Sequence, residues 1–201
     1  FSGSRYYGAP WLIHCAAVRG NWSRRNLEQR QVNVEGTARL YRAAHDHGVS
    51  RIVHVSSTAT LGANRDGRPL TESSVCNIRH LRLSYVDTKL EAEERARAGA
   101  WAGMPIVIVN PCMLVGPRFD GRVPTAVQKV IAGRHRIVPQ GGVSIADVED
   151  VAAGTVAALE RGRAGERYVL GGHNLSWREL YAALARELGA VAPSLVVPGW
   201  A

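Results

Sequence analysis

The chain has 201 residues, which is enough for one well-packed core. Hydrophobic residues make up 46% and charged residues 21%, as in an ordinary globular protein, and no apolar run approaches the ~20 residues of a membrane-spanning helix. The net charge of +8 comes mostly from scattered arginines, without a compact basic block or interleaved aromatic residues. This distribution argues against nucleic acid as a partner and favours an anionic small molecule.

The three cysteines, Cys15, Cys76 and Cys112, lie far apart in the sequence. Their number and spacing match neither a disulfide framework nor a zinc site, so we expect no metal centre. A reducing, cytoplasmic setting fits this cysteine usage best. Cys15 and Cys112 lie in or beside strand-like runs, and we expect both to be buried as small apolar residues.

The first half of the chain alternates strand-like and helix-like segments. The apolar run 11–17 predicts a buried strand, and residues 32–48 show helical spacing that ends at Gly48. Residues 51–57 and 105–111 predict two further strands, separated by a turn-rich loop and a polar helix. Because the strands are apolar throughout and helices separate them, we expect a parallel sheet covered on both faces.

The second half has shorter elements and predicts a smaller α/β lobe. A helix begins near Asp150, and residues 166–172 form a brief strand. Ser176 and Glu179 have the spacing of a capping box at the start of a last helix. We therefore expect one domain over residues 1–116 and part of a second over 117–201.

The segment YVDTK, at the start of the polar helix, places Tyr85 and Lys89 four residues apart. Side chains at this spacing share one face of a helix, and an ammonium group beside a phenol favours the phenolate. Such a tyrosine can act as an acid or base near neutral pH. A lone pair of this kind is more often structural than catalytic.

A pair of serines, Ser56 and Ser57, ends the strand over residues 51–57. Ligands of open parallel sheets bind outside the carboxyl ends of the strands, so a hydroxyl here lies where a substrate is expected. Serine, tyrosine and lysine together suit the interconversion of an alcohol and a carbonyl, with a hydride exchanged with a nicotinamide.

Six motifs occur in an order that resembles the extended short-chain dehydrogenases/reductases, the NAD-dependent epimerase/dehydratase family. They are IHCAA, NVEGT, HVSSTATLG, YVDTK, VNPCMLVGP and DVEDVA, and they cover nearly the whole chain. Two stretches, SSTATLG and ERGRAGERYVLGGHNLSWREL, resemble the branch of hopanoid-associated sugar epimerases and dihydroflavonol-reductase-like proteins. The resemblance implies NAD or NADP as cofactor, a small-molecule substrate and a homodimer.

The resemblance also implies roles for individual residues. Ser57 would hydrogen-bond the substrate oxygen, Tyr85 would be the acid/base, and Lys89 would hold the nicotinamide ribose and favour the phenolate of Tyr85. The residues implied to line the cofactor, besides Tyr85 and Lys89, are Ala16, Ala17, Asn33 and Val109, and those implied to meet the substrate are Asn110 and Arg118.

Simpler interpretations of these residues stay open. The alanines could be small for strand packing alone, Asn33 could cap a helix, and Arg118 could be a solvated loop charge. His14 fits best as a strand histidine with its hydrogen bonds satisfied.

No glycine-rich turn that would seat a pyrophosphate occurs in this chain. We therefore expect a partial doubly wound, Rossmann-type parallel sheet without its first strands, taken from a protein about half as long again. We also expect this chain alone to bind NAD(P) weakly or not at all.

Three hypotheses of function follow. The parent protein is an NAD(P)-dependent epimerase or dehydratase of a sugar, such as a nucleotide sugar. Alternatively, it is an NAD(P)H-dependent ketone reductase of the dihydroflavonol-reductase or hydroxysteroid-dehydrogenase type. In the third hypothesis, the chain is a truncated fragment without catalytic activity.

Overall fold

The computed structural model describes residues 10–20, 26–64, 66–116, 128, 133 and 136–198. The chain divides into two compact units. The first comprises Phe1–Ala63, Leu70–Pro111 and Val151–Leu170, and the second comprises Asn64–Pro69, Cys112–Asp150 and Gly171–Ala201.

A parallel sheet forms the centre of the first unit. Its described strands are β1 (Trp11–His14), β2 (Arg51–Val55), β3 (Ile106–Pro111) and β7 (Arg167–Leu170), in the order β1-β2-β3-β7. Every pair of neighbours is parallel. The predicted parallel sheet is therefore confirmed, with β1 and β2 ending two to three residues before the expected bounds.

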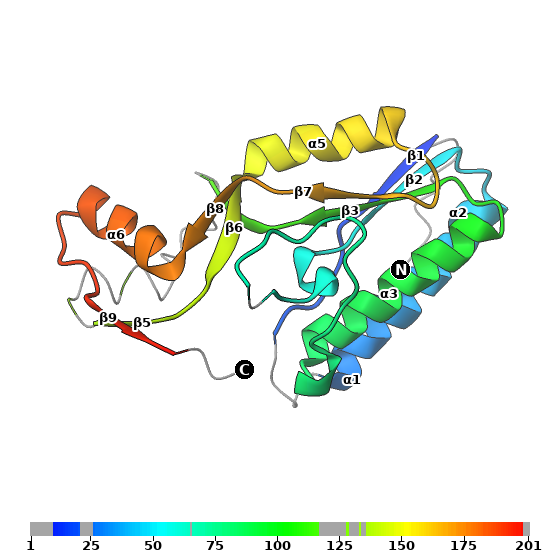
Figure 1. The fold of residues 1–201 in the computed structure, drawn as a ribbon. Helices are drawn as coiled ribbons and strands as arrows, with labels where there is room; N and C mark the ends of the chain where they lie inside the picture. Colours follow the sequence, from blue (N-terminus) through cyan, green and yellow to red (C-terminus); the bar gives the residue numbers. More distant parts are fainter. Residues whose placement is uncertain are drawn as a thin grey trace. The chain divides into compact units, whose positions relative to one another are not determined.

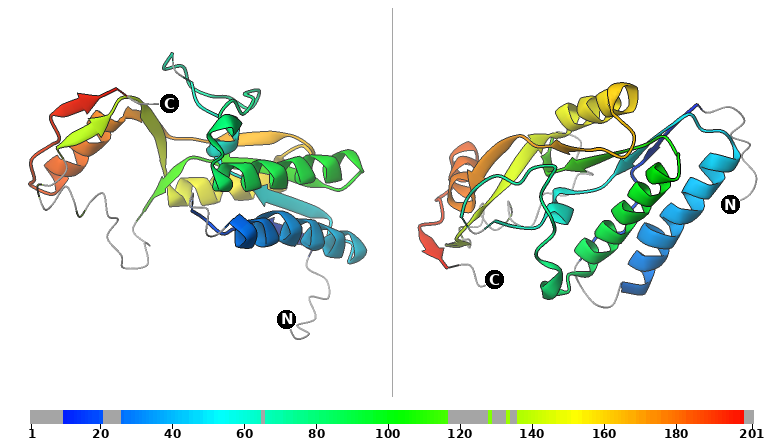
Figure 2. Two further views of the ribbon diagram at one scale, coloured as in Figure 1. Left: turned by 90° about the horizontal axis from the view of Figure 1, so that it is seen from below. Right: turned by 45° about the vertical axis from the view of Figure 1, so that its right-hand side comes forward.

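Helices cover both faces of this sheet. A continuous helical segment precedes β2, and it consists of α1 (Asn26–Gln29), the π-helical η2 (Arg30–Gly36) and α2 (Thr37–Asp46). Two longer helices follow, α3 (Ser84–Trp101) and α5 (Val148–Arg161). α2 and α3 lie on one face of the sheet and α5 on the other (Figure 1). The two helices of the first face run side by side (Figure 2).

The alternation of side chains along the strands builds two cores. Residues two apart on a strand share a face, so Ile106 and Ile108 face α2 and α3, whereas Val107 and Val109 face α5. The first core also holds Tyr41, Ala44, Ile52 and Ala96, and the second holds Val53, Ala158 and Leu159. Apolar residues on both faces explain why the strands read as continuous apolar runs.

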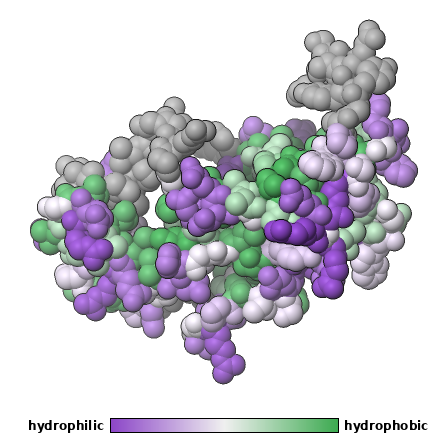
Figure 3. All heavy atoms as spheres, turned by 90° about the horizontal axis from the view of Figure 1, so that it is seen from above, coloured by the Kyte–Doolittle hydropathy of each residue, from purple (hydrophilic) through white to green (hydrophobic). Residues whose placement is uncertain are grey.

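Strand β1 differs from the predicted buried strand. It is an edge strand among those described, and Trp11 and Ile13 are 55% and 39% exposed. Leu12 packs with the core under α2 and α3, so Trp11 and Ile13 point to the other face, where the core under α5 does not reach them. Exposed apolar side chains lie among polar ones on the face of the molecule drawn in Figure 3.

Short strands and one capped helix form the described part of the second unit. A sheet contains β4 (Met113–Val115), β6 (Gly142–Asp147) and β8 (His173–Ser176), and a ribbon contains β5 (Ile137–Pro139) and β9 (Leu195–Val197). Helix α6 (Trp177–Glu187) begins with the predicted capping box: Ser176 Oγ accepts from Glu179 N at 3.1 Å, and Glu179 Oε2 accepts from Ser176 N at 2.8 Å.

The boundary between the units also differs from the expected one after residue 116. Strand β7, expected in the smaller lobe, pairs with β3, and most of α5 packs on the main sheet. The sequence could not predict this, because the pairing joins residues far apart in the chain: Val109 and Tyr168 are neighbours across the two strands, although their numbers differ by 59. The roles expected for the two parts, cofactor and substrate binding, remain predictions.

Candidate active site

The carboxyl end of β2 leads directly into the first candidate residue. Ser57 has an extended backbone, with φ −163° and ψ 150°, and its side-chain oxygen accepts from Ala59 N at 3.2 Å. This bond caps the short 3-10 helix η3 (Thr58–Leu61). Ser57 is half-buried, so its hydroxyl group lies at the end of the strand with part of its surface open to solvent.

The second and third candidate residues lie on the first turns of α3. Tyr85 is half-buried, whereas Lys89 is only 4% exposed. Lys89 Nζ donates to the carbonyl of Val55, the last residue of β2, at 2.7 Å. α3 also packs against η3, so the structure brings the helix with Tyr85 and Lys89 to the strand end that leads into Ser57.

The ammonium group of Lys89 is held in an unfavourable environment. Burial lowers the pKa of Lys89 to about 8, and the negative charges of Glu93 and Cys15 oppose this shift. An ammonium carries three donors, and the Val55 carbonyl takes one of them. A lysine with these properties can donate to ligand hydroxyl groups and change its charge close to physiological pH.

A buried carboxylate, which the sequence analysis did not identify, lies one helical turn beyond Lys89. Glu93 is 2% exposed. Its Oε2 accepts from Ser56 Oγ at 2.6 Å, from Thr60 Oγ1 at 2.8 Å and from Asn110 Nδ2 at 2.9 Å. Its spacing of four from Lys89 was the available signal, but a glutamate in a polar helical run reads as a surface residue.

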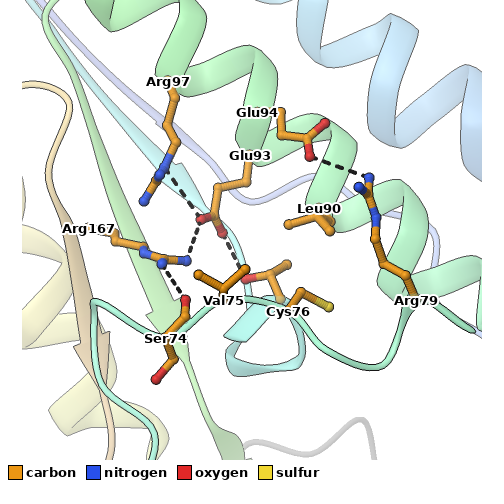
Figure 4. Close-up of a pocket in the computed structure, with 10 residues that line it drawn as sticks. Ser74, Val75, Cys76, Arg79, Leu90, Glu93, Glu94, Arg97 and Arg167 are labelled. Carbon is orange, nitrogen blue, oxygen red and sulfur yellow. Dashed lines mark hydrogen bonds and ion pairs between the residues drawn. The ribbon is translucent and has the colours of Figure 1, made fainter. Parts of the chain in front are cut away.

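The other oxygen of Glu93 faces an arginine. Arg167 NH1 donates to Glu93 Oε1 at 3.1 Å, and the Arg167 side chain is 9% exposed. Arg167 also donates to the carbonyl of Glu72 at 2.7 Å and to that of Ser74 at 2.6 Å, the second of which is drawn in Figure 4. The ion pair therefore fastens the loop around residue 74 to α3 and β7.

Asn110 and Val109 occupy the end of β3 and are both fully buried. The amide nitrogen of Asn110 donates to the Ser57 carbonyl at 3.1 Å and to Thr60 Oγ1 at 3.0 Å, in addition to Glu93. Val109 packs in the core under α5. Asn110 thus holds the backbone of Ser57, and its expected contact with substrate remains a prediction.

The loop after β1 carries the two candidate alanines. Ala16 is exposed and Ala17 is half-buried. Asn33 fixes this loop: its Oδ1 accepts from Val18 N at 2.7 Å, and its Nδ2 donates to Val18 O at 3.0 Å and to Thr88 Oγ1 at 3.1 Å. Asn33 therefore joins the loop to the turn of α3 that holds Lys89, and none of its recorded side-chain bonds caps a helix.

The remaining expectations have mixed outcomes. His14 is buried with Nε2 2.8 Å from Thr37 Oγ1, as expected for a strand histidine with its hydrogen bonds satisfied. Cys112 is buried as expected, but Cys15 is exposed because it follows β1 on the open loop. Arg118 lies outside the described residues.

Two further observations concern the described ranges only. Within them, we find no group of three or more histidine, cysteine or acidic side chains that could hold a metal ion. Each helix in these ranges is too short or too polar to cross a membrane.

Comparison with known proteins identifies the family. The model of the NAD dependent epimerase/dehydratase family matches residues 7–171. The chain belongs to this family. The predicted family and the predicted α/β class with a parallel, Rossmann-type sheet are therefore confirmed.

Family members with different activities resemble the chain. A putative dihydroflavonol 4-reductase of Synechocystis sp. is 34% identical over 96% of this chain and 58% of its own length. The dTDP-glucose 4,6-dehydratase DesIV of Streptomyces venezuelae, solved with NAD, is 28% identical over 96% of this chain and 62% of its own, with a TM-score of 0.79.

A third similar protein is RMD of Pseudomonas aeruginosa, solved with NADPH. It is 23% identical over 94% of this chain and 69% of its own length, with a TM-score of 0.75, which shows a shared fold alone. The chain spans 58% of the length of the first two curated relatives it matches.

Proposed function

We propose that the complete protein is an NAD(P)-dependent enzyme that interconverts an alcohol and a carbonyl. The observation that carries the proposal is the place of Lys89, whose ammonium is fixed to the last carbonyl of β2 at 2.7 Å, one turn from Tyr85. When bound, a nicotinamide cofactor supplies or accepts the hydride. The family membership of the chain supports the same class of chemistry.

The chain's own residues would handle the proton and the substrate oxygen. In this proposal, the Tyr85 hydroxyl gives a proton to the carbonyl oxygen or takes it from the alcohol. The Ser57 hydroxyl hydrogen-bonds the same oxygen, and Lys89 binds ribose hydroxyl groups of the cofactor.

The environment of Lys89 fits a dinucleotide. The exposed Ala16 and the half-buried Ala17 give the first part of the loop after β1 small side chains, and Asn33 ties this loop to the helix of Lys89. Val109 does not fit its expected place in this lining, because its side chain is fully buried in the core under α5, on the face of the sheet opposite α3. NAD and NADP both remain candidates, because structures of similar proteins hold one or the other.

Two substrate classes are supported by different observations. The family model favours epimerisation or dehydration of a sugar, such as a nucleotide sugar, with the part of residues 117–201 that belongs to the second unit as the substrate lobe. The 34% identity with a putative dihydroflavonol 4-reductase favours reduction of a ketone as the second candidate. Asn110 and Arg118 are the proposed substrate-side residues in both cases.

A single assay separates these possibilities. The protein, expressed from its complete reading frame, is incubated with NAD(H) or NADP(H) and with nucleotide sugars or ketones. Epimerisation leaves the total of reduced cofactor unchanged, whereas a ketone reductase oxidises it in step with product. Absence of turnover with both classes, together with absence of dinucleotide binding by calorimetry, would overturn the proposal.

The wider setting is also part of this proposal. A small molecule is the expected partner, and the three thiols, unbridged in the structure, fit a cytoplasmic location. A homodimer is expected from the family resemblance, and sedimentation analysis of the complete protein would test it.

A further inference from the structure

We infer that Glu93 is a positioning residue that sets the place of Ser57 relative to Tyr85 and Lys89. This inference rests on the proposed function, since it assigns a role in the same site. It starts from the order of residues on α3, where Tyr85, Lys89 and Glu93 follow one another at intervals of four. Residues at this spacing lie along one face of a helix, here the face that meets the ends of β2 and β3.

The contacts of Glu93 Oε2 reach both sides of Ser57. Ser56 donates its hydroxyl to this oxygen at 2.6 Å and is the residue directly before Ser57. Thr60 Oγ1 lies 2.8 Å from Oε2 and 2.8 Å from the Ser57 carbonyl. One carboxylate oxygen therefore lies against the side chain of the residue before the candidate serine and against the side chain of Thr60, whose hydroxyl group also lies beside the Ser57 carbonyl.

Asn110 adds a third connection of the same kind. Its amide nitrogen bonds Glu93 Oε2 and the Ser57 carbonyl at 2.9 and 3.1 Å. Because Asn110 is 0% exposed, this link is shielded from water and holds its geometry. The carboxylate thus joins α3, the end of β2 and the end of β3 around Ser57.

The charge of Glu93 is what makes this arrangement work. A carboxylate only accepts hydrogen bonds, and its recorded neighbours in the network are all donors: two hydroxyl groups and an amide on Oε2, and on Oε1 the guanidinium groups of Arg167 at 3.1 Å and Arg97 at 3.9 Å. A glutamine has one accepting oxygen and one donating nitrogen. In either orientation its NH₂ group would face a donor, so Glu93→Gln cannot satisfy both sides at once.

The charge of Glu93 also acts on the ammonium group of Lys89, an effect that a purely structural role of Glu93 would not require. Glu93 carries the largest of the opposite charges that act on Lys89, and its loss lowers the pKa of Lys89 further below about 8. The other groups that face this ammonium are His14 and Cys15 from β1 and its loop, and His54 from β2.

The test compares three variants in the complete protein. Glu93→Gln should lower kcat by about ten- to a hundredfold and leave the KM for the dinucleotide within about threefold, because a small displacement of a catalytic group costs rate more than binding. Glu94→Gln is the matched control: it makes the same change on the next residue of α3, whose exposed carboxylate pairs with Arg79. It should retain wild-type kcat.

Arg167→Gln controls for stability. It weakens the network from the Oε1 side, where Figure 4 shows the Arg167–Glu93 pair, and leaves the Ser56, Thr60 and Asn110 contacts of Oε2 in place. The melting temperature and kcat are measured for both variants. If Glu93 positions Ser57, Glu93→Gln should have a much lower kcat than Arg167→Gln, even where the two variants have lost the same amount of melting temperature. Equal losses of kcat would overturn the inference.

A readout without turnover completes the test. The 201 residues contain two lysines, Lys89 and Lys129, and NMR of ¹³C-labelled lysine follows the Lys89 signal, assigned by its loss in Lys89→Arg. Its titration midpoint should move to lower pH in Glu93→Gln and stay in place in Glu94→Gln. An unmoved midpoint in Glu93→Gln contradicts the inference. An inactive wild-type protein would overturn the proposed function instead, and the titration then decides on Glu93 alone.

Discussion

At the scale of single residues, the candidate site depends on how buried polar groups are matched with one another. Lys89, Glu93 and Asn110 are each at most 4% exposed, and each has hydrogen-bond partners. A buried charge without hydrogen-bond partners would cost free energy of folding, so these groups hold one another in place. Tyr85 and Ser57, in contrast, are half-buried, so each keeps part of its surface exposed.

Replacing the Tyr85 hydroxyl tests the proposed acid/base directly. Tyr85→Phe should lower kcat by about two to four orders of magnitude, because that is the usual contribution of a positioned proton donor. Stopped-flow measurement of hydride transfer in the complete protein would check this. Tyr168→Phe is the control, since the Tyr168 hydroxyl accepts from the Arg163 amide away from α3. Wild-type turnover in Tyr85→Phe would remove Tyr85 from the mechanism.

At the scale of elements, the sheet supports the site through two cores of different composition. Isoleucines dominate the strand side chains under α2 and α3, and valines those under α5. Both cores meet on β3, where successive buried residues alternate between them. β3 is therefore the strand whose packing most directly controls the place of Asn110 at its end.

A cavity in the first core should destabilise the whole first unit. Ile108 is 0% exposed, and Ile108→Ala should lower the free energy of unfolding by about 2–5 kcal/mol, as large-to-small changes in a core do. Denaturant unfolding would measure this change. Val156→Ala, on the exposed face of α5, is the matched control and should change stability little. A small effect of Ile108→Ala would mean that this core is loosely packed.

The elements also show what could be predicted from the sequence. The strands β1 to β3 and the helix α3 were predictable, because apolar runs and helical composition are local signals. Strands β4, β5, β6, β8 and β9 were missed, since all but β6 have only three or four residues and each forms through pairing with another of these short strands. The helix before β2 begins at Asn26 instead of residue 32, because its first turns lack apolar spacing.

For the candidate site, the order of the motifs along the chain predicted Ser57, Tyr85 and Lys89 as site residues. It did not give Glu93, whose burial arises from partners on β2, β3 and β7. It also gave the wrong burial for Cys15, because a residue just past a strand resembles the strand in composition. A single sequence does not show burial that depends on contacts with residues far away along the chain.

At the scale of the whole molecule, two buried histidines make stability depend on pH. Burial, followed by the nearby Lys89 ammonium, lowers the pKa of His14 to about 4 and lowers the pKa of His54 well below its usual 6.5. Tyr41 and His54 also share a hydrogen bond of 2.7 Å in the same cluster. The folded protein therefore holds both histidines neutral at pH values where the unfolded chain binds protons.

The free energy of unfolding should accordingly fall as the pH decreases below about 6.5. Each histidine contributes up to about 1.4 kcal/mol per pH unit, because the unfolded state binds one more proton at that site. Denaturant titrations between pH 7 and 5 would measure the slope. His14→Gln should reduce it, whereas His45→Gln, on the exposed side of α2, should keep it. Equal slopes in wild type and His14→Gln would contradict this account.

The even spacing of Tyr85, Lys89 and Glu93 on α3 restricts which changes in chain length the protein can accept. One residue inserted between Lys89 and Glu93 would turn all that follows by about 100° around the helix axis. The carboxylate would then leave Ser56, while the ammonium stayed at Val55. Gain or loss of a single residue between these positions would therefore separate side chains that a substitution at an exposed position between them leaves together.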